Sequence, residues 1–175
     1  MTGANEAPLD SPIDAARLHE IYSRTAAFYD EVAAAHQAHA KAEALRLLAR
    51  RPGERCLEVG AGTGWAFSRL VEATGRAGAI ALDPAPGMLD VLRDRLAPLD
   101  GAALLLADAR SLPLRDACYD ALLCTYTLEV LPVADFAPVL AEMRRVLRPE
   151  GRIVVADLTD GEGEDAGFTN EWKQG

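Results

Sequence analysis

The chain has 175 residues, half of them hydrophobic, which suits a single domain with a proper core and is too short for two ordinary domains. No apolar run approaches the roughly 18 residues of a membrane span, and the N-terminus lacks the basic start and apolar stretch of a signal peptide, so we exclude fibrous, membrane-inserted and wholly disordered chains and expect a cytoplasmic protein. The net charge of −9 disfavours a nucleic-acid partner, because a surface that follows phosphates needs a positive field.

The segment before residue 53 is expected to be a flexible tail followed by a helical cap. Residues 1–10 resemble a loose tail, and Ser11 then supplies a helix cap with a proline at the first helical position. An Ala-rich helical stretch follows to about Arg50, either as one helix or as two helices that break near His36. We assign residues 11–51 to an N-terminal helical lid.

From residue 52 to residue 158, short apolar strands alternate with helices. The strands are expected at Arg55–Val59, Ala79–Asp83, Ala103–Leu106, Tyr119–Cys124 and Arg152–Asp157. The helices are expected at Thr63–Ala73, Pro86–Leu96 and Asp135–Leu147, and a turn at residues 149–151 ends the last one.

This alternation predicts an α/β protein with a Rossmann-like, doubly wound, mainly parallel sheet and helices on both faces. Near-continuous apolar strands are typical of parallel sheets covered on both sides, and right-handed crossovers leave few other topologies. Ligands of such sheets bind beyond the carboxyl ends of the strands, where the strand order reverses. The functional residues are therefore expected just after each strand.

A glycine-rich turn follows the first strand and opens a helix, in the run LEVGAGTGW from Leu57 to Trp65. Glycines there allow a tight turn and a close approach of the backbone to a ligand, and the helix start offers free N–H groups. The spacing is GxGxG, with Trp65 where a dinucleotide fingerprint has its third glycine. A bulky indole disfavours the dinucleotide hypothesis, an NAD(P)-dependent oxidoreductase, which remains the alternative.

The run LEVGAGTGWAF resembles the first motif of the class I S-adenosylmethionine (SAM)-dependent methyltransferases, with Glu58 at the acidic position of the family. The small-molecule branch, which includes ubiquinone- and menaquinone-biosynthesis methyltransferases, is similar from about Tyr22 to Leu158. The resemblance implies methyl transfer from SAM to a small-molecule acceptor by in-line displacement, with S-adenosylhomocysteine as product. It also implies that the glycine-rich loop contacts the cofactor through Gly60, Ala61, Gly62 and Gly64.

The ends of the second and third strands carry further cofactor-binding candidates. Asp83 is an acid that can accept hydrogen bonds from both ribose hydroxyls, as it would in an NAD site too. The resemblance places Pro84 and Met88 at the border of the adenine, although Met88 is equally well explained as helix core. It also implies that Asp108 accepts from the adenine amino group and that the Ala109 N–H meets the ring.

The fourth strand and the lid supply the candidates nearest the reacting groups. Cys124 and Tyr126 are expected beside the sulfonium, and Glu129 is either a base or a solvated acid at a helix end. By resemblance, Tyr22 and Tyr29 belong to a lid over the methionine end of SAM. They are seven residues apart and hence share a helical face, where an aromatic pair is also typical of core. We name Glu129 and Tyr29 as the candidate proton acceptors.

The C-terminal part departs from the resembled family, which adds a helix and two more strands after the fifth strand. Only 18 residues follow Asp157, and residues 159–175 read as an acidic, Gly-rich tail or a truncated C-terminal portion. Two hypotheses follow from this departure. In one, a homodimer covers the open sheet edge, and in the other, the chain is a non-catalytic SAM-binding or scaffold domain. The histidine and cysteine spacings predict no metal site.

Overall fold

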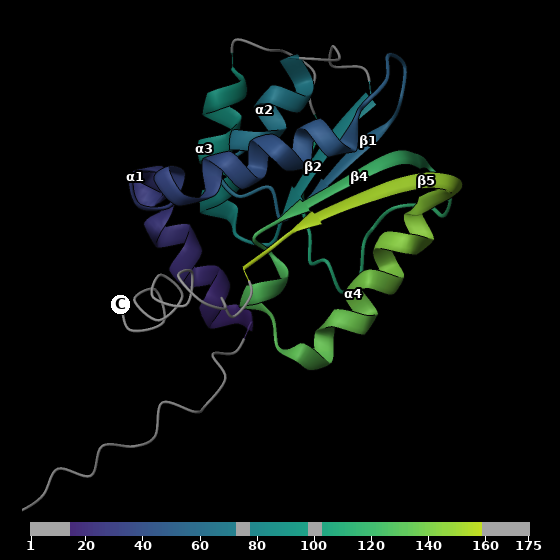
Figure 1. The fold of residues 1–175 in the computed structure, drawn as a ribbon. Helices are drawn as coiled ribbons and strands as arrows, with labels where there is room; N and C mark the ends of the chain where they lie inside the picture. Colours follow the sequence, from purple (N-terminus) through teal and green to yellow (C-terminus); the bar gives the residue numbers. More distant parts are fainter. Residues whose placement is uncertain (1–14, 73–77, 98–102, 159–175) are drawn as a thin grey trace, which may run out of the picture.

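The fold is a five-stranded parallel sheet with helices on both faces (Figure 1). It comes from a computed structural model that describes residues 15–72, 78–97 and 103–158. The strand order is β3-β2-β1-β4-β5, and the strands are β1 (Cys56–Val59), β2 (Ala79–Asp83), β3 (Ala103–Leu106), β4 (Tyr119–Thr125) and β5 (Leu147–Ala156). The predicted Rossmann-like class is thus confirmed, and the tails assigned to residues 1–10 and 159–175 lie outside the described residues.

The order of the strands reverses at β1, which pairs with β2 on one side and with β4 on the other. In these two ladders Val59 is level with Leu82 and with Cys124, so the three strands end at the same edge of the sheet. Loops leaving this edge diverge in opposite directions, which opens a crevice there. The sequence placed the candidate site at this edge.

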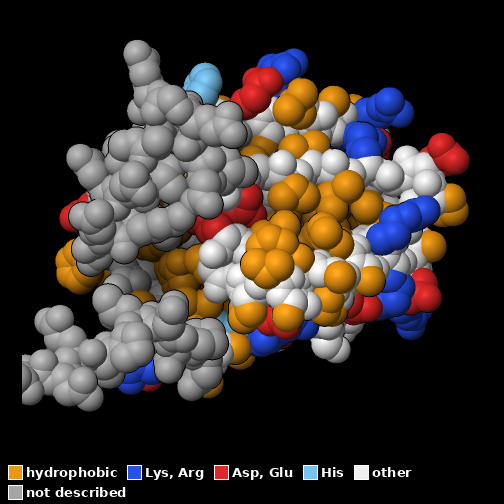
Figure 2. All heavy atoms as spheres, turned by 60° about the horizontal axis from the view of Figure 1, so that its bottom comes forward, with side chains coloured by type: hydrophobic (Ala, Val, Ile, Leu, Met, Phe, Trp, Pro, Cys, Tyr) orange, Lys and Arg blue, Asp and Glu red, His pale blue; other side chains and the backbone are white. Residues whose placement is uncertain are grey.

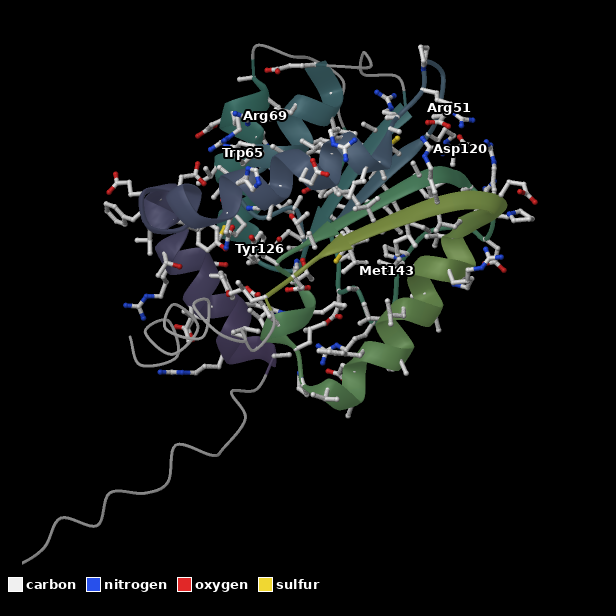
Figure 3. All side chains as sticks on the ribbon, in the orientation of Figure 1. Arg51, Trp65, Arg69, Asp120, Tyr126 and Met143 are labelled. Carbon is white, nitrogen blue, oxygen red and sulfur yellow. The ribbon has the colours of Figure 1, made fainter. Side chains whose placement is uncertain are left out.

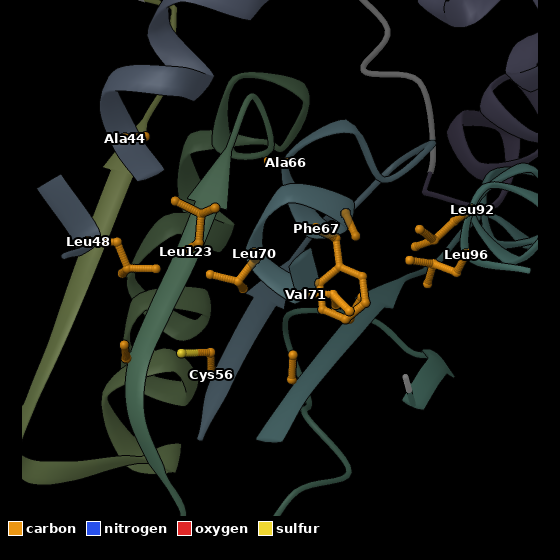
Figure 4. Close-up of a cluster of buried hydrophobic side chains, with 14 of the residues drawn as sticks. Ala44, Leu48, Cys56, Ala66, Phe67, Leu70, Val71, Leu92, Leu96 and Leu123 are labelled. Carbon is orange, nitrogen blue, oxygen red and sulfur yellow. The ribbon is translucent and has the colours of Figure 1, made fainter. Parts of the chain in front are cut away.

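The helices cover the sheet unequally. In Figure 1, α1 (Ala15–Leu48), α2 (Trp65–Glu72) and α3 (Pro86–Leu96) lie on one face, and α4 (Val133–Val146) lies on the other. A buried cluster joins α1, α2 and α3 to the sheet through side chains such as Leu48, Phe67 and Leu92 (Figure 4). A second cluster, with Met143 and Val146 of α4, fills the opposite face. Among the described residues, no helix is long and apolar enough to cross a membrane.

The lid helix α1 is unbroken from Ala15 to Leu48, so the option of two separate helices is wrong. The helix changes direction part-way, however, as Figure 1 shows. Its first part runs past the carboxyl edge of the sheet, and its last part packs Ala44 and Leu48 into the core. The bend therefore lets one helix serve as both lid and core element.

The fifth strand begins at Leu147, five residues before the predicted start at Arg152. The residues predicted to form a turn, 149–151, instead form an irregularity within the strand. Tyr119 pairs with Leu147 and Ala121 pairs with Arg152, so the longer stretch of β5 bulges between these pairs. The bulge accommodates Pro149, which has no N–H to donate to a regular ladder.

Candidate functional site

An open cavity lies at the carboxyl edge of the sheet. Its wall comes from α1, the loop after β1, the ends of β2 and β4, the loop after β3 and the short helix η2 (Leu128–Val130). Eleven of the predicted site residues line it: Tyr22, Tyr29, Gly60, Ala61, Gly62, Asp83, Pro84, Met88, Asp108, Ala109 and Tyr126. Segments far apart in the sequence thus meet where the strand order reverses.

The glycine-rich loop takes a shape that other residues would strain. Gly60, Gly62 and Gly64 have φ angles of +70°, +52° and +80°, in the left-handed region that favours glycine. A Cβ on Gly60 would lie 2.1 Å from the Thr127 Oγ1, and one on Gly64 would lie 1.9 Å from the Leu92 Cδ1. A Cβ on Gly62 would meet nothing within 4 Å. Gly64 therefore serves packing against α3, while Gly62 leaves open space beside its backbone.

Asp83 at the end of β2 is held by two backbone donors. The Gly62 N–H donates to Oδ2 over 2.8 Å, and the Ala85 N–H donates to Oδ1 over 2.9 Å. Burial raises the pKa of this carboxyl, while the two hydrogen bonds oppose that rise. Each oxygen keeps a further lone pair, so the fixed carboxylate can still accept hydrogen bonds from a ligand in the cavity.

Met88 and Pro84 lie beside Asp83 on the cavity wall. Met88 is also buried against Ala26 and Ala85 in a small cluster between α1 and α3. The position of Met88 is therefore compatible with both interpretations, a contact at the border of the adenine and a residue of the helix core.

Asp108 in the loop after β3 forms an ion pair that the sequence did not predict. The Arg110 guanidinium donates to both of its carboxylate oxygens, with Nη2 to Oδ2 at 2.5 Å, and also reaches Asp135 over 3.1 Å. These hydrogen bonds hold the pKa of Asp108 below its usual value. Asp108 thus faces the cavity as an ionised group whose orientation Arg110 fixes.

Three tyrosines form an aromatic wall. The rings of Tyr22 and Tyr29 on α1 meet edge to face, with centroids 5.9 Å apart, and the Gln37 amide donates to the Tyr29 hydroxyl over 3.4 Å. Burial raises the pKa of both hydroxyls, which keeps them protonated at neutral pH. Tyr126 follows β4 with a φ of +54° and lies toward α1, as Figure 3 shows.

One carboxylate, Asp30, fixes the lid helix to the rest of the site. It accepts a hydrogen bond of 2.5 Å from the Thr63 hydroxyl in the glycine-rich loop and forms an ion pair with Arg95 of α3. Because Asp30 follows Tyr29 directly, these contacts also position the aromatic wall.

Four predicted residues do not line the cavity: Glu58, Gly64, Cys124 and Glu129. Cys124 points into the core cluster on the α4 side, because alternate residues of β4 face opposite sides of the sheet. Burial raises the pKa of its thiol to about 12, so it is an inert core residue rather than a cavity contact. The neighbouring Thr125 and Tyr126 line the cavity in its place.

Glu58 in β1 is buried, with 1% of its surface exposed. Its Oε2 has no hydrogen-bond partner within the part of the chain that the structure describes. Desolvation raises the pKa of this carboxyl to about 8, against the attraction of Lys41.

Glu129 lies in η2 and connects this helix to the end of β5. The Leu158 N–H donates to its Oε2 over 3.0 Å, while the Leu128 N–H donates to Asp157 over 2.8 Å. Burial and the neighbouring Asp157 carboxylate raise the pKa of Glu129, and the Leu158 hydrogen bond opposes that rise. The carboxyl interacts electrostatically with all three tyrosines, which places it beside the aromatic wall.

Sequence reasoning missed two charged or titratable residues on the cavity wall, His19 and Lys41, both on α1. His19 lies near Asp83 and Asp108, whose pKa values it lowers. Lys41 carried a usable signal: Tyr29, Gln37 and Lys41 are spaced by multiples of four, which puts them on one helical face. In the described ranges, no group of His, Cys, Asp and Glu has the arrangement of a metal site.

Comparison with known proteins decides the family. Residues 56–151, more than half of the chain, match the methyltransferase domain family. The chain belongs to this family. The resemblance carried by the glycine-rich run is therefore confirmed, and the match gives no support to a nicotinamide-dependent oxidoreductase.

Relatives of this methyltransferase domain are longer than the chain. A malonyl-[acyl-carrier protein] O-methyltransferase of Serratia marcescens is 38% identical over 99% of this chain and 62% of that protein. A demethylmenaquinone methyltransferase of Tropheryma whipplei is 32% identical over 82% of this chain and 60% of that protein. A solved DhpI complex with S-adenosylhomocysteine is 26% identical, with a TM-score of 0.69, over 81% of this chain and 68% of that one. The chain thus spans 62% and 60% of the two curated relatives.

Proposed function

We propose that this methyltransferase domain binds SAM in the cavity and transfers its methyl group to a small-molecule acceptor. The observation that carries the proposal is the joint geometry of the glycine-rich loop and Asp83: a buried carboxylate, fixed by the Gly62 and Ala85 N–H groups, faces open space beside a glycine backbone. This arrangement suits a ribose, whose hydroxyls donate to the carboxylate while the backbone approaches closely.

The residues of the cavity fit the three parts of SAM. Asp83 suits the ribose, and Asp108 with the Ala109 N–H suits the adenine edge, because one accepts and the other donates. The aromatic wall of Tyr22, Tyr29 and Tyr126 suits a sulfonium, which is attracted to the face of an aromatic ring. In this proposal Cys124 and Gly64 support the site from the core and do not touch the cofactor.

When bound, SAM supplies a methyl group activated by the positive sulfur. The protein then has to hold the acceptor in line with that methyl group and exclude water, and such positioning is worth about 7–11 kcal/mol. The lid residues Tyr22 and Tyr29 are placed for this task, because Asp30 ties their helix to both the glycine-rich loop and α3.

Glu129 and Tyr29, the two candidate proton acceptors, differ in position, because Tyr29 lines the cavity and Glu129 does not. Burial and the neighbouring Asp157 raise the pKa of Glu129, which favours a base that acts near neutral pH. The Tyr29 hydroxyl, in contrast, is kept protonated by burial and is suited to donate a hydrogen bond to the acceptor. Of the two candidates from the sequence, we therefore propose Tyr29 as the group that positions the acceptor at the cavity wall, and Glu129 remains the candidate base beside the aromatic wall.

Calorimetry with SAM and S-adenosylhomocysteine tests the binding part of the proposal. We expect both to bind with a stoichiometry of one per chain, whereas folded protein that binds neither would contradict the proposal. A turnover assay with a panel of quinols, phenols, amines and carboxylic acids then tests catalysis. Binding without any turnover would favour the non-catalytic SAM-binding domain.

We also propose that a second copy of the chain covers the edge of β5 that pairs with no other strand among the described residues. Ile153 and Val155 on this strand are 41% and 39% exposed, and Val133 and Leu140 of α4 are exposed as well. Figure 2 shows apolar side chains gathered on the face of the molecule that it presents. Exposed edges with apolar side chains favour pairing. Light scattering of a strict monomer at micromolar concentration would contradict this dimer.

A further inference from the structure

The lid helix α1 and helix α3 touch through their backbones at the start of α3. A Cβ on Gly87, the second residue of α3, would lie 2.7 Å from the Ser23 Cα and 2.8 Å from the Ser23 carbonyl carbon, both on α1. The φ angle of Gly87 lies outside the positive region, so its own backbone conformation does not require glycine. The close approach of α1 is therefore what requires a glycine at this position.

Ser23 also satisfies a backbone group at the start of α3. The first N–H groups of a helix have no partner within the helix, and a polar side chain at the preceding residue usually accepts one. Here that residue is Ala85, which has no such side chain, and the Gly87 N–H donates instead to the Ser23 Oγ over 3.3 Å. The lid helix thus caps a segment that follows Asp83 directly, at the end of the cavity that the proposed function assigns to the nucleoside (the nucleoside end).

A second anchor lies further along both helices. Asp30, seven residues after Ser23, forms an ion pair with Arg95, eight residues after Gly87. The two helices therefore run side by side in the same direction for about two turns. Between the two anchors, the small side chain of Ala26 is buried, with 4% of its surface exposed. We call the contacts from Ser23 and Gly87 to Asp30 and Arg95 the α1–α3 seam.

The α1–α3 seam adjoins the cavity. Tyr22 and Tyr29, which line the cavity, directly precede the two residues of α1 that anchor the seam, Ser23 and Asp30. Both tyrosines also pack against the buried cluster that contains Met88 of α3, another residue of the cavity wall. A displacement of α1 along this seam would therefore move part of the aromatic wall away from the nucleoside end.

We propose that Gly87 is a positioning residue that seats the lid on α3, and that the seated lid slows the release of SAM and S-adenosylhomocysteine. A side chain at this position pushes Ser23 away from α3, breaks the cap and shifts the aromatic wall. The part of the inference that concerns release rests on the proposed function. The seating of α1 does not, because it is measured in the free protein.

Hydrogen exchange of the free protein tests the seating. Gly87→Ala adds the Cβ, and Asp94→Ala, at an exposed position of the same helix, is the matched control. Alanine forms helices more readily than glycine or aspartate, so both changes favour α3 itself, and only Gly87→Ala meets α1. We expect Gly87→Ala to raise the exchange of the amides of residues 15–30, while the strands and residues 40–48 keep wild-type exchange. Asp94→Ala should match the wild-type chain throughout.

Release of S-adenosylhomocysteine tests the effect on the cofactor. In a chase of labelled S-adenosylhomocysteine with excess unlabelled ligand, release should be about tenfold faster for Gly87→Ala and within about twofold of wild type for Asp94→Ala. Ser23→Ala removes the capping hydroxyl and adds no atom, so it should raise the release rate by about two- to fivefold. It should also raise the exchange of residues 15–30, and it provides the same test if Gly87→Ala does not fold.

The outcomes separate this inference from the proposed function. Wild-type exchange at residues 15–30 in Gly87→Ala would overturn the seating. Higher exchange in every segment, the sheet included, would show that Gly87 serves the packing of the whole fold and would overturn the seating too. Higher exchange at residues 15–30 with an unchanged release rate would overturn the effect on the cofactor. If wild-type protein binds no S-adenosylhomocysteine, the proposed function and the effect on release both fail, while the exchange data still decide the seating.

Discussion

The acids on the cavity wall and the acid buried in β1 are held in opposite ways. At the end with Asp83 and Asp108, backbone N–H groups and the Arg110 guanidinium hold the carboxylates in fixed orientations, and Arg110 lowers the pKa of Asp108. In β1, Glu58 is buried without a partner for its Oε2 among the described residues, and its pKa rises to about 8. Two acids of the site are thus held by hydrogen bonds within the described residues, whereas the buried Glu58 carboxyl keeps an oxygen without a partner there.

This difference suggests what the acids on the cavity wall do. Preformed hydrogen-bond acceptors suit a neutral group such as a ribose or an adenine, which brings donors and no charge. Glu58, in contrast, is uncharged at neutral pH, because burial raises its pKa to about 8, and its Oε2 has no hydrogen-bond partner among the described residues.

Removing Asp83 should have the largest effect on binding. Asp83→Ala deletes charge-assisted hydrogen bonds worth about 1.5–3 kcal/mol, which corresponds to roughly a 10- to 150-fold loss of affinity. S-adenosylhomocysteine and 5′-methylthioadenosine share the nucleoside, so the affinity for both ligands should fall by the same factor in calorimetry.

The matched control for Asp83 is Asp90→Ala. Asp90 is an exposed acid on α3, where it pairs only with Arg93 of the same helix among the described residues. We expect its removal to leave both affinities unchanged. Since Asp83 also anchors the Gly62 and Ala85 N–H groups, the melting temperature of Asp83→Ala should be measured first. A folded Asp83→Ala variant with wild-type affinity would remove Asp83 from the site.

The nucleoside end could be predicted from the sequence because its residues follow the strands. The carboxyl ends of parallel strands lie at one edge of the sheet. Once the strands were predicted correctly, Asp83, Asp108 and the glycines could therefore be predicted to lie close together. The apolar runs predicted all five strands and the order of the motifs that follow them, except that β5 starts earlier than predicted. Its residues 149–151 contain the turn signals Pro149 and Gly151, and only the pairing with β4 shows that they form a bulge.

The other end could not be predicted in the same way, because α1 supplies much of it. A helix of 34 residues presents every side chain at some angle, and its bend decides which of them reach the cavity. Tyr22 and Tyr29 were placed by resemblance, and Lys41 was missed. Cys124 was misplaced because its side depends on the alternation of β4, which a fully apolar strand does not reveal.

Glu58, buried in β1, gives the stability of the fold a pH dependence that can be measured without a ligand. The unfolded chain loses the proton of this carboxyl near its ordinary pKa of 4.5, while the folded chain keeps it to about 8. The stability contributed by the protonated carboxyl is therefore full below pH 4.5 and is lost as the pH rises to about 8. Glu58→Gln stays neutral throughout, so its melting temperature should fall less over this window than that of the wild-type chain.

The shift of this pKa from 4.5 to about 8 corresponds to at most about 5 kcal/mol over this window. Since about 1 kcal/mol shifts the melting temperature of a chain of this size by roughly 2–4 °C, we expect a difference of several degrees or more. Thermal denaturation at a series of pH values between 4.5 and 8 measures it. Glu31→Gln, a change of an exposed acid on α1, is the matched control and should follow the wild-type curve. Parallel curves for Glu58→Gln and wild-type protein would show that Glu58 is not the source of the pH dependence.

Arg110 should have the smallest effect, because its pair with Asp108 is about one-third exposed on each side. Exposed ion pairs are worth about 0–1 kcal/mol, so Arg110→Ala should weaken S-adenosylhomocysteine by less than about fivefold at neutral pH. The loss of affinity caused by Arg110→Ala should be larger at acidic pH. Arg110 holds the pKa of Asp108 low, so without it Asp108 takes up a proton at a higher pH and affinity begins to fall earlier on acidification. Calorimetry from pH 7.5 to pH 4 tests this shift, and superimposable pH profiles for the two proteins would mean that Asp108 does not contact the ligand as an ionised acceptor.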